Sequence, residues 1–558
     1  MAGATWTRSR RICRRIEVEG TLTLLTPASF GGEAAGVTDM PLLRDPLQGV
    51  ALLPGASIAG ALRAALWELE QGYGVDYNPK NAHHQKSLAV QLFGAIAGDA
   101  EGIQSPLIVD DALGAPPRTE VRDGVAISAT TRTAADDQKF DMELLRAGTT
   151  FPLRFELLIS AQSDDEANDE ANDEAGDEAS DEAATADNGT PLRRALAQAL
   201  ALLETRGEIH LGRRKRRGFG ECQAGDWRVR EWDLTTAPGL LDYLAGAGTP
   251  RAGRPIKELL YPAPAQPPAD VDRRAYFRLR ATFALESSLL IRAAEGAVAG
   301  PDAQHLQRPG LDAAPSATSW TPLLPGTSLA GALRARARRI AQTLHGNDGA
   351  RLVDDLFGRI PPAGKQETDA PGRRAAPPER YPAGRVEVSE RPIVETEPGG
   401  IKTLVQTRIR IDRLTGGVLD SFLFEEAPLF GGTQSQVKID VRLRAPSDAE
   451  IGLLLQVLKD LWLTDLALGG ESGVGRGRLV GLSARLTHRR VVDGHGQCAR
   501  WRFTQSWDGR ARGSLVFDPK KAQPAGLERF ATALRQWKLE SANRPPSGAD
   551  GQPQGDAA

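Results

Sequence analysis

The sequence predicts an α+β protein that contains two copies of one domain. Residues 53–63 recur as residues 324–334, with nine of the eleven positions identical. In both copies a strand-like segment precedes this motif, and a ribbon of strands and a glycine-rich loop follow it in the same order. A chain of 558 residues is also too long to fold around a single hydrophobic core. We therefore expect two consecutive, duplicated domains.

The elements of the first copy follow from the spacing of its apolar residues. Residues 12–27 alternate apolar and polar side chains, which is typical of a half-buried strand. A Pro-Gly turn at 54–55 leads into a segment with apolar residues at helical spacing. Residues 119–157 have the pattern of a β-ribbon, and residues 192–203 that of an apolar helix. The glycine-rich loop at 211–220 then leads into a final strand.

Offsets between the two copies locate the insertions. The helix motif recurs at an offset of 271, the ribbon at 284 and the glycine-rich loop at 257. A Pro- and Arg-rich insertion in the second copy explains why the offset rises to 284 at the ribbon. An acidic insertion in the first copy explains why it falls to 257 at the glycine-rich loop. We therefore expect a first domain at 12–235, with a disordered acidic insertion at 163–189, and a second domain at 273–487, with its insertion at 360–383. A Pro-rich linker at 236–272 joins them. A C-terminal extension at 488–540 and a disordered tail at 541–558 follow.

The charge of the chain is unevenly distributed. The net charge is −3, yet residues 164–187 hold twelve acidic residues and no basic one, so the remainder carries an excess of nine positive charges. Such an excess favours a polyanionic partner, for example a nucleic acid. The three cysteines are too widely spaced for a disulfide framework or a zinc site. Since the sequence shows no apolar run of transmembrane length and no signal-peptide core, we expect a cytoplasmic protein with no membrane partner.

The repeated helix motif is the first candidate binding feature. A helix N-terminus presents unpaired amide groups and a partial positive charge, which suit an anion such as a phosphate. Ser57 and Arg63 in the first copy, and Ser328 and Arg334 in the second, would cap and reinforce such a site. The alternative is a capped core helix without a ligand. The presence of the motif in both copies favours one phosphate site per domain.

The two glycine-rich loops are the second candidate. Neither matches a nucleotide-binding fingerprint, because the glycines are not followed by Lys-Ser or Lys-Thr and both loops lead into strands, so we expect no organic cofactor. A flexible turn of this kind can lie against a phosphodiester, and the basic run in the first loop adds electrostatic attraction. The alternative is a tight turn with solvated charges. The candidate phosphate-binding residues of the loops are Gly212, Arg213, Arg214, Lys215, Arg216, Arg217, Gly218, Gly220, Gly469, Gly470, Gly475, Arg476 and Gly477.

Together these features resemble a known family. The order of strand, loop, Leu-Pro-Gly-x-Ser-x-x-Gly-x-Leu-Arg helix, ribbon and glycine-rich loop is similar to that of the RAMP superfamily backbone subunits of type III CRISPR effector complexes. Two copies in one chain resemble the fused two-domain subunit of type III-D systems. The resemblance implies a ferredoxin-like core in each domain, related to the RNA-recognition motif. It also implies a protruding β-ribbon thumb in each, at 119–157 and 385–435.

The resemblance further implies a catalytic residue. Residues 36–46 are similar to the family's Val-Asp-x-Pro-Val-x-x-Asp-Pro pattern, and Asp39 falls on the active aspartate. A carboxylate there can orient or deprotonate a ribose 2′-hydroxyl, or hold a divalent cation such as Mg²⁺ or Mn²⁺. In the second copy no acid lies at the same distance from the helix motif, and Asp302 with His305 is the best candidate pair. The longer second loop also fits a domain that binds RNA without cutting it.

The function implied by the resemblance is that of a subunit that binds guide RNA, assembles with other CRISPR effector subunits and cleaves complementary target RNA. Two alternatives stay open. One is a structural RNA-binding subunit without catalysis, and the other is a stand-alone endoribonuclease that processes guide precursors. The second alternative usually needs a histidine base, and no histidine is convincingly placed for that role.

Overall fold

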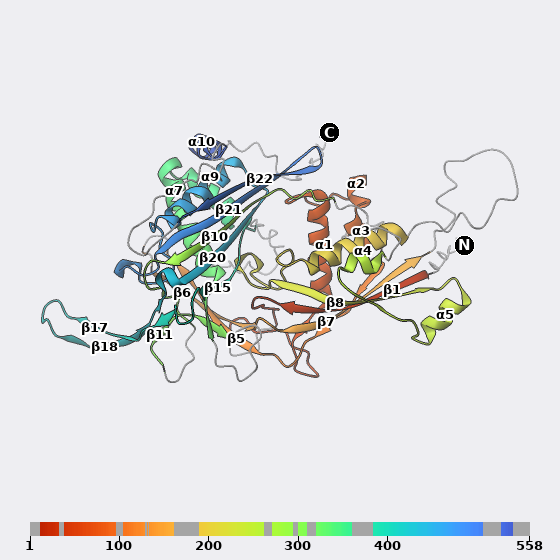
Figure 1. Ribbon diagram of the computed structural model, residues 1–558, viewed down its shortest axis with the longest axis horizontal. Helices are drawn as coiled ribbons and strands as arrows, with labels where there is room; N and C mark the ends of the chain where they lie inside the picture. Colours follow the sequence, from red (N-terminus) through yellow and green to blue (C-terminus); the bar gives the residue numbers. More distant parts are fainter. Residues whose placement is uncertain are drawn as a thin grey trace, which may run out of the picture.

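The computed structural model shows a mixed α+β protein with one large sheet in each half, covered by helices (Figure 1). This confirms the α+β class. We call the described residues up to 261 the N-terminal half and those from 271 the C-terminal half. The structure describes residues 12–32, 38–95, 104–128, 131, 133–160, 189–261, 271–293, 300–309, 320–359, 383–505 and 526–538.

The sheet of the N-terminal half is organised around β1 (Ile12–Leu24). Its order is β3-β7-β1-β8-β9, where β9 is Arg251–Gly253, with antiparallel neighbours throughout. Ile16, Val18 and Leu22 are fully buried, because every second residue of the strand points to the face that the helices cover. The other elements are β2 (Leu52–Leu53), α1 (Gly55–Gln71), α2 (Ala82–Gln85), α3 (Leu88–Phe93), β3 (Leu107–Val109), β4 (Ala112–Leu113), β7 (Thr150–Ser160), α4 (Gly189–Glu204) and β8 (Cys222–Asp233).

The sheet of the C-terminal half is larger and has β10 (Tyr276–Leu285) at its centre. Its order is β12-β13-β15-β20-β10-β21-β22, and β14 also pairs with β20. Phe277, Leu279 and Phe283 of β10 are buried under the helices. The other elements are β12 (Gln307–Pro309), β13 (Trp320–Leu324), α7 (Gly326–His345), α8 (Asp348–Phe357), β14 (Val386–Val388), β15 (Arg391–Glu395), β20 (Ser435–Arg444), α9 (Asp448–Trp462), β21 (Leu479–Val492), β22 (His495–Thr504) and α10 (Glu528–Gln536).

Both halves follow the same β-α-β-β-α-β order. In the N-terminal half the order is β1-α1-β3-β7-α4-β8, and in the C-terminal half it is β10-α7-β14-β20-α9-β21. In each sheet the first strand lies between the third and the fourth. The repeated motifs therefore occupy corresponding places in two similar arrangements.

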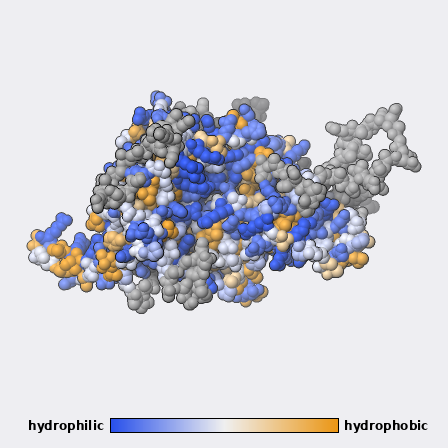
Figure 2. All heavy atoms as spheres, in the orientation of Figure 1, coloured by the Kyte–Doolittle hydropathy of each residue, from blue (hydrophilic) through white to orange (hydrophobic). Residues whose placement is uncertain are grey.

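Each half carries a β-hairpin that is separate from its large sheet. The first pairs β5 (Thr119–Ile127) with β6 (Ala134–Leu145), and the second pairs β17 (Gln406–Ile411) with β18 (Val418–Ala427). The second hairpin protrudes from the body of the molecule (Figure 1), and apolar side chains are exposed near its end (Figure 2). Both hairpins are shorter than the predicted ribbons at 119–157 and 385–435, because β7, β14 and β15 bury apolar residues within the large sheets.

The segment predicted as a linker, 236–272, is largely folded. It contains α5 (Ala237–Leu244), β9 (Arg251–Gly253) and α6 (Ile256–Leu260). β9 extends the first sheet, and Ile256 and Leu260 are fully buried in the first core. Hydrophobic burial therefore attaches this segment to the N-terminal half.

Several predicted segments fall wholly or mainly outside the described residues. These are the insertions at 163–189 and 360–383, residues 262–270 of the linker and the tail at 541–558. The C-terminal extension at 488–540 begins inside β21, so it continues the second sheet through β22 and adds α10. Among the described helices, none has the length and apolar character needed to span a membrane.

A buried ion network joins the two halves. Arg122 of β5 contacts both carboxylate oxygens of Glu390, at 2.5 and 3.2 Å, and Arg308 contacts the same carboxylate at 3.3 Å. Both Arg122 and Glu390 are buried. Burial lowers the pKa of Arg122, but the carboxylates of Glu390 and Glu120 outweigh it and hold that pKa above its ordinary value.

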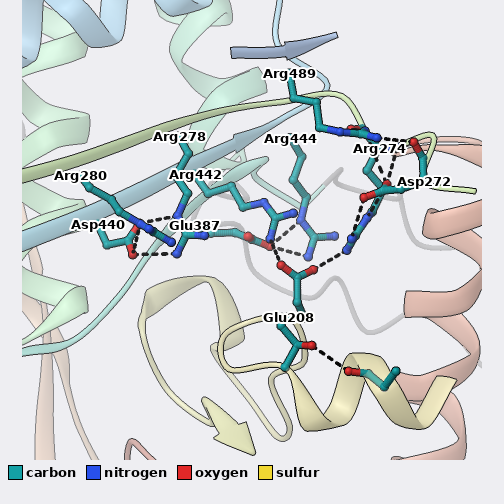
Figure 3. Close-up of polar contacts among 12 residues, drawn as sticks. Glu208, Asp272, Arg274, Arg278, Arg280, Glu387, Asp440, Arg442, Arg444 and Arg489 are labelled. Atoms are coloured by element: carbon teal, nitrogen blue, oxygen red, sulfur yellow. Dashed lines mark hydrogen bonds and ion pairs between the residues drawn. The ribbon is translucent and has the colours of Figure 1, made fainter. Parts of the chain in front are cut away.

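A second group of ion pairs also joins the two halves (Figure 3). Glu208 of the N-terminal half pairs with Arg274 at 2.5 Å and with Arg442 at 3.4 Å. Burial would raise the pKa of Glu208, but these arginines lower it below its ordinary value. Glu68 of α1 pairs with Arg444 of β20 at 2.5 Å. Charged contacts between the halves therefore fix how the two sheets meet.

Candidate nucleic-acid interface

Asp39 lies at the base of the first hairpin. Its carboxylate Oδ2 accepts a hydrogen bond from the main-chain amide of Asp141 at 2.9 Å, and the Asp141 Oδ1 accepts one from the amide of Asp39 at 2.7 Å. The next residues, Met40 and Met142, form a parallel bridge. The Asp39 side chain is exposed, and no described residue bonds to its Oδ1. The hairpin thus holds an accessible carboxylate in a fixed place.

Asp302 occupies the corresponding place in the C-terminal half. Its Oδ2 accepts a hydrogen bond from the amide of Glu425 at 2.8 Å. Glu425 follows Asp141 at the ribbon offset of 284, and the next residues pair in parallel again, as β11 (Ala303–Gln304) with β18. Strand pairing therefore identifies Asp302 as the counterpart of Asp39, although their distances along the chain from the helix motif differ.

His305 is buried, and its ring is engaged by the main chain and not by the exposed Asp302 carboxylate. Its side chain is 1% exposed, and its two ring nitrogens contact the main chain of Ile291 and Leu323 at 3.2 and 3.0 Å. Burial lowers its pKa to about 4. A neutral imidazole with both nitrogens engaged has no free position for a proton from RNA. The structure therefore leaves His305 out of the candidate catalytic group.

The N-terminus of α1 is capped from within the protein. The amide of Gly55 donates to Asp111 Oδ1 at 2.6 Å, and the Ser57 side chain makes no capping hydrogen bond. Arg63 donates to the carbonyl of Gly94 at 2.9 Å, which ties α1 to the end of α3. Ser57 lies exposed in the first turn. The prediction that Ser57 caps the helix is wrong, because the Asp111 carboxylate takes that position.

The N-terminus of α7 is covered by the N-terminal half. A Cβ on Gly326 would come within 2.2 Å of the Arg217 carbonyl oxygen, so only glycine fits there. Arg334 pairs with Asp354 of α8 at 2.8 Å, and the Ser328 side chain again makes no capping bond. The arginines of both helix motifs thus connect neighbouring helices and do not point a free charge at the helix end.

The two glycine-rich loops share one backbone conformation. Each contains a short 3₁₀ turn, Lys215–Arg217 in the first and Ser472–Val474 in the second. A left-handed residue precedes each turn, Arg214 in one loop and Glu471 in the other, and a left-handed glycine follows. Residues 214 and 471 correspond at the loop offset of 257. The first loop therefore has a cation where the second has a carboxylate.

The basic side chains of the first loop lie in two different environments. Arg216 contacts the carbonyl of Gly384 and Arg217 that of Phe357, so both side chains belong to the junction. Arg213, Arg214 and Lys215 remain exposed. The Arg214 guanidinium lies 4.4 Å from the ring centre of Phe140, the residue before Asp141. The structure therefore brings Arg214 to the hairpin base beside the Asp39 loop.

The second loop is tied to its hairpin by a charged cluster. Arg476 is 3% exposed and pairs with Glu426 at 2.9 Å and with Glu471 at 2.8 Å. Arg408 of β17 contacts the same two carboxylates. Burial and the adjacent Glu426 carboxyl raise the pKa of Glu471. Arg476 thus has an internal role and offers no free charge to RNA.

An open cleft of about 720 Å³ lies between the second loop and the hairpin base. Lys402, Gln406 and Arg408 line it, together with glycines at 399–400, at 431–432 and at 475 in the second glycine-rich loop. In the N-terminal half the corresponding loop glycine, Gly218, packs against the main chain of Glu390. Among the residues that the structure describes, no group of three metal-ligating side chains is gathered at this or any other place.

Comparison with known proteins gives the family. The model of the RAMP superfamily matches residues 21–223 and 317–480, and so covers parts of both halves. The CRISPR system Cms endoribonuclease Csm3 of Mycobacterium tuberculosis is 30% identical over 249 residues, which are 41% of this chain and 92% of that protein. The resemblance to RAMP subunits of type III CRISPR complexes, first seen in the repeated motifs, is confirmed. The chain belongs to the RAMP superfamily.

Proposed function

We propose that the chain is an RNA-binding backbone subunit of a type III CRISPR ribonucleoprotein and that it cleaves complementary RNA at Asp39. In this proposal each half is a ferredoxin-like RAMP unit, and the hairpins β5–β6 and β17–β18 act as thumbs against a guide-target duplex. The supporting observation is the exposed Asp39 carboxylate, held at the hairpin base beside Arg214. The similarity to an endoribonuclease of a CRISPR system supports the same activity.

The chemistry follows from these two side chains. The Asp39 carboxylate would accept the proton of a ribose 2′-hydroxyl, which then attacks the adjacent phosphorus and expels the 5′-oxygen of the next nucleotide. Arg214 is near enough to the hairpin base to stabilise the negative charge that grows on the phosphate. A thumb that turns one nucleotide out of the duplex would align the attacking oxygen.

A divalent cation is part of the proposal. Mg²⁺ and Mn²⁺ are often held by one or two carboxylates together with phosphate oxygens of the substrate. Asp39, held in place by its hydrogen bonds with Asp141, supplies one such carboxylate, which fits this mode. When bound, the cation would neutralise charge on the scissile phosphate. Guide RNA, target RNA and other effector subunits are the proposed partners, in the cytoplasm.

The C-terminal half offers a second, weaker cleavage position at Asp302. Asp302 shares the placement of Asp39, but Glu471 stands where the first loop has Arg214. This carboxylate, paired with Arg408 and Arg476, does not stabilise the charge on the phosphate as Arg214 would. We therefore expect slower cutting at Asp302 than at Asp39.

The test uses the assembled complex with its guide RNA, Mg²⁺ or Mn²⁺, and a labelled complementary RNA. Asp39→Asn keeps the acceptor for the Asp141 amide but removes the charge, and we expect one cut to slow by roughly 10²-fold or more. Asp302→Asn should remove only a minor cut. Asp45→Asn is the matched control, because Asp45 caps a turn in the same loop through bonds that asparagine preserves.

Two cleavage assays separate the alternative functions. An unchanged cut pattern in both Asp39→Asn and Asp302→Asn would make the chain a structural RNA-binding subunit, with catalysis elsewhere in the complex. Cleavage of a guide-precursor transcript by the isolated chain would instead support a processing endoribonuclease.

A further inference from the structure

A large cleft lies on the open face of the second sheet, away from both loop aspartates. It has a volume of about 890 Å³, and both halves contribute to its walls. The floor consists of β10, β20, β21 and β22, on the face opposite the helices. The N-terminal half closes one side with the segment between α4 and β8. Strongly hydrophilic side chains gather over this part of the molecule (Figure 2).

The lining of the cleft is strongly basic. Only three of its residues, Glu221, Glu387 and Asp440, are acidic. Nine are cationic: Arg206, Lys215, Arg278, Arg280, Arg391, Lys438, Arg442, Arg485 and Arg502. The lining residues therefore carry a formal excess of six positive charges, of which the one on Arg442 is offset by Glu208.

Several of these cations already have partners. Arg278 makes a two-pronged contact with Asp440, at 2.9 and 2.8 Å, and Arg280 approaches the same carboxylate at 3.4 Å (Figure 3). Burial and then the adjacent Arg278 lower the pKa of Arg280. Among the described residues, no carboxylate lies within ion-pair distance of Lys438, Arg485 or Arg502, and all three are exposed.

Three of the cations stand in a row across the sheet, and two of them, Arg485 and Arg502, are the unpaired ones. Arg280 is directly opposite Arg485, and Arg485 is directly opposite Arg502. Like charges at directly opposite positions destabilise a sheet. A bound anion would relieve this repulsion, so the row is better suited to a ligand than to stability alone.

The corresponding face of the first sheet carries acidic and basic side chains that pair with one another. Its central strand β1 carries Glu17 and Glu19, where β10 carries Arg278 and Arg280. Glu17 pairs with Arg154 at 3.0 Å and with Arg230 at 3.7 Å. The positive cleft is therefore specific to the C-terminal half and does not follow from the fold.

We infer that this cleft binds a segment of single-stranded RNA through its phosphates. Arginine and lysine with nearby hydroxyl groups are the side chains that contact phosphate and sugar, and Thr282, Ser483 and Thr504 supply hydroxyls beside the cations. Tight binding of a protein segment depends on anchors that fill apolar pockets, and the apolar residues of the sheet floor, Ala281, Ile439, Ala484 and Phe503, are buried. A groove between two walls also suits a single strand.

The inference goes beyond the proposed function, because it uses residues other than Asp39, Asp302 and the hairpins. The test measures the affinity of the full chain for a labelled 20-nucleotide oligouridylate by fluorescence anisotropy, at salt concentrations from roughly 50 to 200 mM. The variants are Arg485→Gln, Arg502→Gln and the double variant. Arg228→Gln is the matched control, because Arg228 is exposed at the corresponding position of β8.

For the double variant we expect about a tenfold loss of affinity at low salt, and a decrease of roughly 1.4 in the slope of log affinity against log salt, about 0.7 for each lost contact. Arg228→Gln should change affinity by less than about twofold. Thermal melting checks folding, and relief of the repulsion predicts no loss of melting temperature.

Wild-type affinity and slope in a folded double variant would overturn the inference. Displacement of the RNA by poly-glutamate as effectively as by unlabelled oligouridylate would overturn it too, because the cleft would then recognise acidic protein. The cleavage proposal is judged by the cut pattern of Asp39→Asn in the assembled complex, whereas this inference is judged by the oligouridylate affinity of the cleft variants. A failure of the cleavage proposal can thus be distinguished from a failure of this one.

Discussion

Asp39 and Asp141 exchange hydrogen bonds, each carboxylate accepting from the other residue's main-chain amide, at 2.9 and 2.7 Å. This pair connects a loop near the beginning of the chain to a hairpin about a hundred residues later. In the C-terminal half Asp302 makes the equivalent contact with the amide of Glu425. The pairing gives Asp141 a positioning role that can be tested.

Asp141→Ala should slow the cut assigned to Asp39 by on the order of tenfold to a hundredfold, because the Asp39 amide loses its partner and the loop shifts. Asp141→Asn keeps an acceptor and should restore most of the rate if the role is positional. The measurement is single-turnover cleavage in the assembled complex. Equal rates in wild type and Asp141→Ala would contradict the prediction.

Glu390→Ala should destabilise the junction between the halves by about 3–5 kcal/mol, because it leaves Arg122 and Arg308 buried without their shared carboxylate. The control is Asp123→Ala, which removes the partner of the exposed Lys139 in the first hairpin and should cost less than about 1 kcal/mol. Urea unfolding measures both. Similar losses in the two variants would rule out a special role for the buried network.

His305 should make stability depend on pH in the acidic range. Its pKa is about 4 in the folded chain and near 6.5 when unfolded, so the unfolded state binds the extra proton first. Stability is then fully present above about pH 6.5 and decreases towards pH 4, by on the order of 3 kcal/mol. His305→Gln should flatten this part of the profile.

His495→Gln is the control for His305, because His495 is exposed on β22 and its substitution should leave the profile unchanged. The readout is the unfolding free energy at a series of pH values. A profile for His305→Gln with the wild-type slope between pH 6.5 and 4 would refute the assignment.

Asp111→Ala should cost about 1 kcal/mol of stability, because it removes the cap from the Gly55 amide at the start of α1. Ser57→Ala should leave stability unchanged or raise it slightly, since Ser57 makes no capping bond and alanine is the better helix former. Thermal melting of the two variants compares them directly. A larger loss of stability for Ser57→Ala than for Asp111→Ala would show that Ser57 caps the helix.

The sequence by itself determined the repeated motifs and the elements that they predict. The motif at 53–63 and 324–334, the alternation of 12–27 and the glycine-rich loops depend on local spacing, which the chain order preserves. These features were sufficient to identify the RAMP superfamily and to single out Asp39. They were also sufficient for the α+β class.

Only the tertiary structure decided which side chains meet. Asp302 was recognisable as the counterpart of Asp39 only through strand pairing, because an insertion alters its distance from the helix motif. Asp111 replaced Ser57 as the helix cap because a distant loop reaches Gly55. The arginine row of the second sheet arises from β10 and from the hairpin β21–β22, which is distant from β10 in the chain, and the strand register sets Arg280, Arg485 and Arg502 side by side. Local patterns fix the elements, whereas contacts between distant segments depend on packing, which spacing along the chain does not encode.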